Sequence, residues 1–174
     1  DKALKYGIYR HLPTYEKIIR NLVSFYIKKN TFMIPVSGEM IPLSMVNDET
    51  FRSGMMGCGF AIKPSSQNIV SPVDGTIKMI FPTGHAMGIS FQDGKEMLIH
   101  VGIDTVELQG QGFQVMVKQD QKISAGDSLL QIDLPFIEEK GYDSVIIIVF
   151  PNESELHLPQ LPKQVTCKET ITIF

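Results

Sequence analysis

The sequence contains no tryptophan, only two cysteines and no long apolar run. Cys58 and Cys167 lie far apart and lack the spacing of a metal-binding motif, so they predict neither a disulfide framework nor a zinc knuckle. No segment approaches the ~18 to 20 consecutive apolar residues that a membrane-spanning helix needs, and no signal peptide can be read at the start. These absences favour a protein of a reducing, cytoplasmic compartment.

A large excess of charge of one sign is also missing. The 16 Lys and Arg residues are balanced by 19 Asp and Glu residues, which gives no indication of a nucleic-acid partner. The charges are unevenly distributed, since residues 1–30 carry a net +5 and the remainder a net −8. A length of 174 residues with 43% hydrophobic side chains suits one domain with a sizeable core. We therefore expect a basic helical tail or linker over residues 1–30 and one domain over residues 31–174.

The basic tail has the pattern of an amphipathic helix. Its apolar positions follow the three-and-four spacing of one helical face: Tyr15, Ile18, Ile19, Leu22, Val23 and Tyr26. Thr14 is a suitable N-cap after Pro13, which predicts a helix of roughly four turns. This helix suits a connector, a helix docked on the domain, or a helix on an acidic membrane surface. Because the chain begins at Asp1 without a methionine, a membrane domain attached upstream is also compatible with it.

After Asn30 the sequence changes to short apolar runs separated by Gly, Pro, Asn and Asp every 8 to 12 residues or so, which is typical of an all-β sandwich or barrel. The expected strands cover residues 32–36, 60–63, 68–71, 75–81, 86–92, 95–101, 113–117, 128–133, 144–150 and 164–173. Residues 136–140 predict one short turn of helix.

Two histidines are predicted to meet across a hairpin. Asp93-Gly94 favours a two-residue type I′ turn, because both residues tolerate positive φ. Met87 would then face His100, and His85, two residues before Met87, would lie on the same face with Cβ atoms ~7 Å from those of His100. A single bulge between the histidines would move one of them to the other face.

Paired imidazoles suit phosphoryl transfer. A neutral imidazole nitrogen is a good phosphoryl acceptor near pH 7, and a second imidazole can bind the phosphoryl oxygens during the transfer. Thr83 adds a hydroxyl group near His85. The spacing by itself does not decide which histidine is the acceptor.

A zinc site is the alternative use of the same residues. His85, His100 and Asp104 are a possible ligand set, and the pair by itself could capture zinc weakly. A hydrolytic zinc site is disfavoured because no third ligand has a diagnostic spacing and the HExxH pattern is missing. His11 and His157 have no such partner and are predicted to be surface residues. No cofactor is expected.

Several motifs resemble the glucose-type enzyme IIA (EIIA) domain of the phosphoenolpyruvate-dependent sugar phosphotransferase system. They are Ser37-Gly38-Glu39 with Pro42-Leu43, FRSGMMG at 51–57, Phe60-Ala61-Ile62, PVDGT at 72–76, TGHA at 83–86, HVGIDTV at 100–106, and Gln121-Lys122 with Gly126-Asp127. The resemblance covers about residues 34–174 and does not include residues 1–30.

The resemblance implies a phosphotransferase component with an antiparallel β-sandwich of the duplicated hybrid motif type. His100 would be phosphorylated through Nε2, with His85 and Thr83 in supporting roles. The phosphoryl group would come from the phosphocarrier HPr and pass to a cysteine of an enzyme IIB domain, which phosphorylates the incoming sugar. The matching partner-binding positions are Phe51, Met55, Met56, Phe81, Leu98, Asp104 and Val106.

The chain departs from the family at a few positions around the histidines. Leu98 and Val101 stand where the family often has aromatic residues, and Gly84 stands where it often has a polar one. A second function stays open for the same face: a regulatory module whose docking on transporters or enzymes changes when His100 is phosphorylated.

Overall fold

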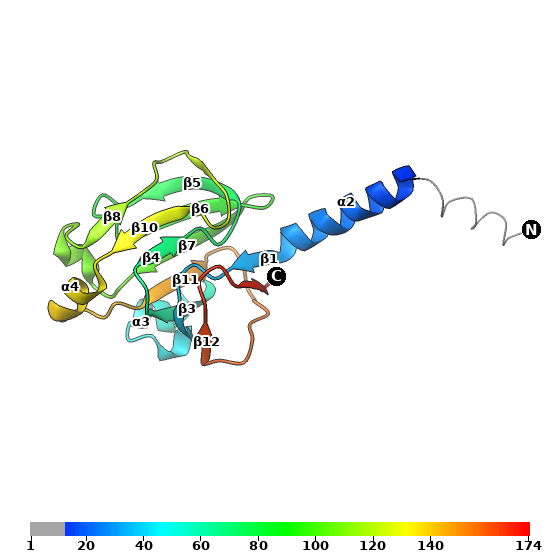
Figure 1. The fold of residues 1–174 in the computed structure, drawn as a ribbon. Coiled ribbons are helices and arrows are strands. Elements are labelled where there is room, and N and C mark those ends of the chain that lie inside the picture. Colours follow the sequence, from blue (N-terminus) through cyan, green and yellow to red (C-terminus); the bar gives the residue numbers. More distant parts are fainter. Residues whose placement is uncertain (1–12) are drawn as a thin grey trace, which may run out of the picture. The chain divides into compact units, whose positions relative to one another are not determined.

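The computed structural model describes residues 13–174, which form two compact units (Figure 1). The first unit ends at Thr31 and the second runs from Phe32 to Phe174.

Helix α2 (Pro13–Asn30) makes up most of the described part of the first unit. It begins at Pro13, so Thr14 lies in its first turn and is not the N-cap that we expected. Proline is well suited to the first position of a helix because the N–H that it lacks would have no partner there. The large apolar side chains of the helix are exposed: Tyr15, Ile18, Ile19, Leu22, Val23, Phe25 and Tyr26. Among the described residues, no helix is both long and apolar enough to cross a bilayer.

Most elements of the second unit are β-strands, largely in antiparallel pairs. They are β1 (Thr31–Met33), β2 (Gly38–Pro42), β3 (Cys58–Pro64), β4 (Asn68–Val70), β5 (Gly75–Ile80), β6 (Ala86–Phe91), β7 (Lys95–Val101), β8 (Phe113–Val115), β9 (Lys122–Ile123), β10 (Ser128–Ile132), β11 (Ile146–Phe150), β12 (Lys163–Val165) and β13 (Thr170–Thr172). The short helices are η1 (Leu43–Met45), α3 (Glu49–Arg52), η2 (Thr105–Leu108) and α4 (Leu134–Glu139).

The strands form one large sheet and two small ones. The eight-stranded sheet has the order β12-β2-β3-β11-β7-β6-β5-β9, the three-stranded sheet has the order β4-β10-β8, and β1 pairs with β13. The main hydrophobic core joins one face of the large sheet to the three-stranded sheet. A smaller core covers part of the opposite face, where η1 and α3 lie. The expected antiparallel β-sandwich is therefore confirmed.

Strand β11 lies between the two hydrophobic cores, which accounts for its continuously apolar sequence, Ile-Ile-Ile-Val-Phe. Ile146, Ile148 and Phe150 belong to the main core, whereas Ile147 and Val149 belong to the smaller one. Because successive strand residues point to opposite faces, a strand covered on both sides needs apolar residues at every position.

Some elements differ from the sequence prediction. Strand β2 was not expected, and the predicted strand over residues 32–36 is the shorter β1. The strand expected over 164–173 is two strands, β12 and β13, because a turn in which Lys168 has positive φ separates them. The predicted helical turn at 136–140 is confirmed as α4, which begins two residues earlier.

The β6–β7 hairpin has a three-residue loop, so the two-residue turn expected at Asp93-Gly94 is wrong. Phe91 pairs with Lys95, and residues 92–94 all have positive φ. Asp and Gly adopt this conformation readily, but Gln92 adopts it as well, so the loop contains one more residue than the motif indicates.

The longer loop moves the hairpin register by one residue. Ala86 faces His100, and Met87 faces Ile99, so the predicted pairing of Met87 with His100 is wrong. The shared-face argument for His85 is also wrong, because in this register His85 would alternate to the other face. His85 lies just before β6, outside the regular strand, so strand alternation does not fix the direction of its side chain.

Candidate functional site

His100 lies near the end of β7, on the face of the large sheet that carries the smaller core. It faces Ala86 of β6 on one side and Ile147 of β11 on the other, and Ile147 in turn faces Ala61 of β3. Directly opposed residues point to the same face of a sheet, so these four side chains form one row. The small alanine side chain beside His100 leaves room next to the imidazole.

His85 reaches the same place from the turn that precedes β6. Gly84 has φ +74, and a Cβ there would lie 2.9 Å from Cγ2 of Val115, so the turn favours glycine at this position. The backbone carbonyl of His85 accepts a hydrogen bond of 2.7 Å from the N–H of Val101, which holds the turn against β7. The centroids of the His85 and His100 rings are 5.1 Å apart and the ring planes are nearly perpendicular at 83°.

Thr83 orients the second imidazole. Its Oγ1 lies 2.5 Å from Nδ1 of His85, a short hydrogen bond between two side chains of the same turn. This contact engages Nδ1 and leaves Nε2 of His85 available to the site. The Phe81 ring also lies against His85, at a centroid distance of 5.3 Å.

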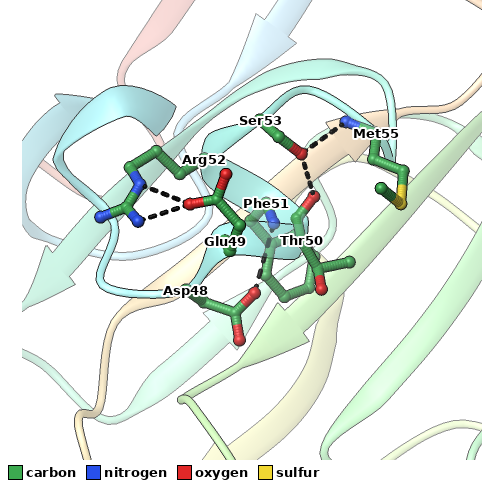
Figure 2. Close-up of polar contacts among 7 residues, drawn as sticks. All are labelled: Asp48, Glu49, Thr50, Phe51, Arg52, Ser53 and Met55. Atoms are coloured by element: carbon green, nitrogen blue, oxygen red, sulfur yellow. Dashed lines mark hydrogen bonds and ion pairs between the residues drawn. The ribbon is translucent and has the colours of Figure 1, made fainter.

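The loop that contains α3 covers the other side of His100. The Phe51 ring lies 4.9 Å from the His100 ring with an interplanar angle of 57°. Phe51 is almost completely buried and belongs to the smaller core with Ile147 and Ala61. Asp48 caps α3 by accepting a hydrogen bond from the N–H of Phe51 (Figure 2).

The two imidazoles line a hollow of about 310 Å³. Six of the seven expected partner-binding residues line it too: Phe51, Met56, Phe81, Leu98, Asp104 and Val106. Met55 is not in the lining, but it is 80% exposed just beyond α3. The structure therefore brings together the histidines and an apolar rim that includes the exposed side chains of Phe81 and Val106.

Five lining residues were not among the predicted site residues: Asp48, Thr50, Ala86, Ile103 and Thr105. Asp48 had a local signal, because an aspartate that directly precedes Glu49 is typical of a helix start. That signal did not show where the helix would lie. His157 is exposed and does not line the hollow, and His11 lies outside the described residues.

Both imidazoles are neutral at pH 7. Burial lowers the pKa of His100 to about 4, and the neighbouring charge of His85 acts in the same direction. The Gly102 backbone and the carboxylates of Asp48 and Asp104 oppose this shift, because they favour the protonated ring. Burial also lowers the pKa of His85.

The two nitrogens of His100 are in different surroundings. Nδ1 is buried and has no hydrogen-bond partner of good geometry, although the Gly102 backbone still acts on the ring as a weak acceptor. Such an environment suits a neutral ring that carries its proton on Nδ1 and its lone pair on Nε2. The arrangement can therefore offer a nucleophilic nitrogen with a second imidazole at its side.

The structure gives little support to a metal centre at this place. Within residues 13–174, no group of three or more His, Cys, Asp and Glu side chains is arranged to hold a metal ion. Asp104, the third ligand considered for zinc, is an exposed residue in the left-handed conformation at the start of η2. Cys58 and Cys167 are free thiols, and burial raises the pKa of each.

Comparison with known families finds one match that covers most of the chain. The family model described as phosphoenolpyruvate-dependent sugar phosphotransferase system, EIIA 1, matches residues 30–156.

Curated relatives include both multidomain and single-domain proteins. The glucoside-specific EIICBA component of Staphylococcus carnosus is 43% identical over 127 residues, which are 73% of this chain and 18% of the relative. The glucose-specific EIIA component of Oceanobacillus iheyensis is 42% identical over 125 residues, which are 72% of this chain and 76% of the relative. The chain thus spans about a fifth of the multidomain relative and most of the single-domain one.

A solved structure has the same fold. The glucose permease IIA from Mycoplasma capricolum is 38% identical, superposes with a TM-score of 0.76, and covers 82% of this chain and 94% of its own.

Proposed function

Because the chain belongs to the EIIA 1 family of the phosphoenolpyruvate-dependent sugar phosphotransferase system, in its glucose-type branch, we propose that it carries a phosphoryl group on His100. The group comes from HPr and passes to a cysteine of an enzyme IIB domain. The observation that carries this proposal is the pair of neutral imidazoles 5.1 Å apart at an apolar-rimmed hollow.

The acceptor atom in this proposal is Nε2 of His100. Its lone pair forms the bond to phosphorus while the donor's bond to phosphorus breaks, and the bonding electrons return to the donor. In the second step the IIB sulfur forms a bond to phosphorus and the Nε2–P electrons return to the imidazole. A ring whose pKa is lowered to about 4 keeps the Nε2 lone pair available at pH 7.

His85 supports the transfer without carrying the group. Its ring is nearly perpendicular to the His100 ring at a centroid distance of 5.1 Å, and the Thr83 hydroxyl engages Nδ1. When the hydroxyl donates its proton to Nδ1, the ring carries its own proton on Nε2, which can then donate to a phosphoryl oxygen.

The rim of the hollow is the docking face for HPr and IIB. Phe81 and Val106 expose apolar surface in the lining of the hollow, Met56 lines it as well, and Met55 is exposed just beyond α3. Flexible, methionine-containing surfaces adapt to more than one partner, and a relay must release each partner quickly. Asp104, exposed on the same rim, favours partners with basic side chains.

Phosphorylation with purified components tests the proposal. Incubation with phosphoenolpyruvate, enzyme I and HPr should give an acid-labile phosphate on the wild-type protein and none on His100→Ala. His157→Ala is the matched control, because it removes an exposed histidine outside the hollow. Lack of label on the wild type in the presence of active partners would falsify the carrier role.

Onward transfer tests the role of His85. His85→Ala should still accept the phosphoryl group from HPr but pass it to a IIB domain more slowly than the wild type. Equal transfer kinetics in the two proteins would contradict the supporting role. Acceptance without transfer to any IIB domain, in the wild type, would indicate a purely regulatory module.

Residues 1–30 bring the carrier to the cytoplasmic face of the membrane in this proposal. They carry a net +5, and α2 exposes seven large apolar side chains, a combination suited to an anionic lipid surface. The fused EIICBA relatives support the other form of the same role, a connector to a membrane permease. Sedimentation with anionic and with zwitterionic vesicles tests lipid binding, which should require the anionic lipid.

A further inference from the structure

The short helix beside the site depends on the side chain of Asp48. Asp48 has an extended backbone with φ −153 and ψ 122, and its Oδ1 accepts a hydrogen bond of 3.3 Å from the N–H of Phe51 (Figure 2). Its backbone carbonyl accepts a second hydrogen bond, of 2.9 Å, from the N–H of Arg52. A helix of only four residues has few internal hydrogen bonds, so the hydrogen bonds of its N-cap contribute a large share of its stability.

The residue that receives this cap is the one that contacts the reactive histidine. Phe51 is 6% exposed, and the centroid of its ring lies 4.9 Å from that of the His100 imidazole. The two rings are tilted by 57°, so Phe51 forms one wall of the space that the imidazole occupies. The order of contacts is therefore Asp48 carboxylate, Phe51 backbone, Phe51 ring and His100 ring.

We infer that Asp48 is a positioning residue for phosphoryl acceptance: by capping α3 it holds the Phe51 ring against the imidazole of His100. The inference rests on the proposed function, because it assigns a role in that reaction. The constraint matters because Nδ1 of His100 has no hydrogen-bond partner of good geometry and only the Gly102 backbone as a weak acceptor, so packing against Phe51 contributes to the orientation of the ring.

A competing role for Asp48 is purely electrostatic. Its side chain lines the hollow, where its charge acts on His100 or on an arriving partner. The two roles separate by substitution, because asparagine is as good an N-cap as aspartate but carries no charge. Asp48→Asn keeps the cap and removes the charge, and Asp48→Ala removes both.

Glu49→Gln is the matched control. Glu49 is the next residue, and its carboxylate is exposed and pairs with Arg52 at 2.5 Å on the surface of α3 (Figure 2). It does not line the hollow. The substitution therefore removes one negative charge from the same helix without affecting the Phe51 contact.

Single-turnover phosphorylation by phospho-HPr measures the effect. At saturating donor, Asp48→Ala should accept the phosphoryl group roughly fivefold more slowly than the wild type, the factor expected from the loss of a typical N-cap. Asp48→Asn and Glu49→Gln should stay within about twofold of the wild type. The donor concentration at half-maximal rate should not change, because the effect is on orientation and not on docking.

Nuclear Overhauser contacts between the Phe51 and His100 rings provide a readout without phosphate. They should be present in the unphosphorylated wild type, Asp48→Asn and Glu49→Gln, and weaker in Asp48→Ala. If Asp48→Ala does not fold, Phe51→Leu removes the ring while leaving the cap, and the same fivefold loss is expected from it.

Two results would overturn the inference: wild-type rates and ring contacts in Asp48→Ala, or an Asp48→Asn variant as slow as Asp48→Ala, which would assign the effect to charge. If the wild type itself accepts no phosphate, the carrier function fails, and the ring contacts still decide whether the cap positions His100.

Discussion

Lowering the pH from 7 to 5.5 should leave the imidazole of His100 neutral and able to accept a phosphoryl group. The reason is that burial, helped by His85, lowers the pKa of His100 to about 4. A histidine with the ordinary pKa of about 6.5 would be only about one tenth neutral at pH 5.5, whereas a pKa of about 4 leaves nearly all of it neutral. The neutral, nucleophilic fraction of His100 should therefore fall by only a few per cent between pH 7 and 5.5. The neutral fraction of an unperturbed histidine would fall about tenfold.

The same shift predicts how His100 affects stability. Its pKa is lower in the folded than in the unfolded protein, so below pH 6.5 the unfolded chain binds the proton more tightly. His100 therefore has no destabilising effect above pH 6.5 and destabilises the fold progressively as the pH falls toward 4. Between pH 7 and 4.5 the loss should be about 2.5 kcal/mol.

Three measurements check this prediction. NMR of the His100 ring resonances, from pH 7.5 to the lowest pH at which the protein stays folded, gives the titration midpoint of His100 in the folded protein. The same titration in denaturant gives its pKa in the unfolded chain. Single-turnover acceptance from pre-formed phospho-HPr at pH 7 and 5.5 gives the reactivity. Urea unfolding at pH 7 and 4.5 should show that His100→Gln loses less stability than the wild type.

A midpoint near 6.5 would refute this reasoning, because the ring would then behave as a solvated histidine. A tenfold fall in acceptance at pH 5.5 together with a low midpoint would place the pH sensitivity on the donor. Equal stability losses in His100→Gln and the wild type would show that His100 does not contribute to the acid sensitivity of the fold.

Three further substitutions test the supports of the site. Gly102→Ala should destabilise the protein by about 1–3 kcal/mol in urea unfolding, because Gly102 has φ +76 and a Cβ there would lie 2.3 Å from Cγ2 of Thr105; an unchanged midpoint would show that the turn relaxes. Thr83→Val removes the hydroxyl that contacts Nδ1 of His85, so transfer to IIB should slow several-fold in a quenched-flow assay while acceptance by His100 persists, and equal rates would contradict a tautomer-fixing role. Ile147→Ala removes a fully buried side chain beneath the site and should cost about 2–5 kcal/mol in the same unfolding assay, a much smaller loss indicating that the smaller core can collapse.

The fold class could be predicted because its signals are local. Short apolar runs between turn residues indicated the antiparallel sandwich, and the continuous apolar run of β11 agrees with a strand buried on both faces. The spacing of Tyr15, Ile18 and Leu22 predicted helix α2, and proline chemistry accounts for its start at Pro13, two residues before the first helical residue that a Thr14 cap would give. These features depend on residues within a few positions of each other.

The histidine pair was predicted by a register that the structure does not have. The signal at Asp93-Gly94 located the hairpin, but the participation of Gln92 lengthened the loop by one residue and moved Ala86 opposite His100. The two rings nevertheless lie 5.1 Å apart, because the turn at Gly84 delivers His85 from outside the strand. Loop length depends on the balance between several turn conformations of similar energy, and a dipeptide motif does not determine that balance.

The sequence by itself determined the chemistry available to this protein: the two imidazoles, the hydroxyl beside one of them, and the motifs that identify the family. Only the tertiary structure decided which distant residues complete the site, since Asp48 and Phe51 reach His100 across about fifty positions of the chain through the packing of α3 on the large sheet. The tertiary structure also determines the pKa of His100. An imidazole loses its proton affinity through burial and through its neighbours, and both exist only once the strands and α3 have come together.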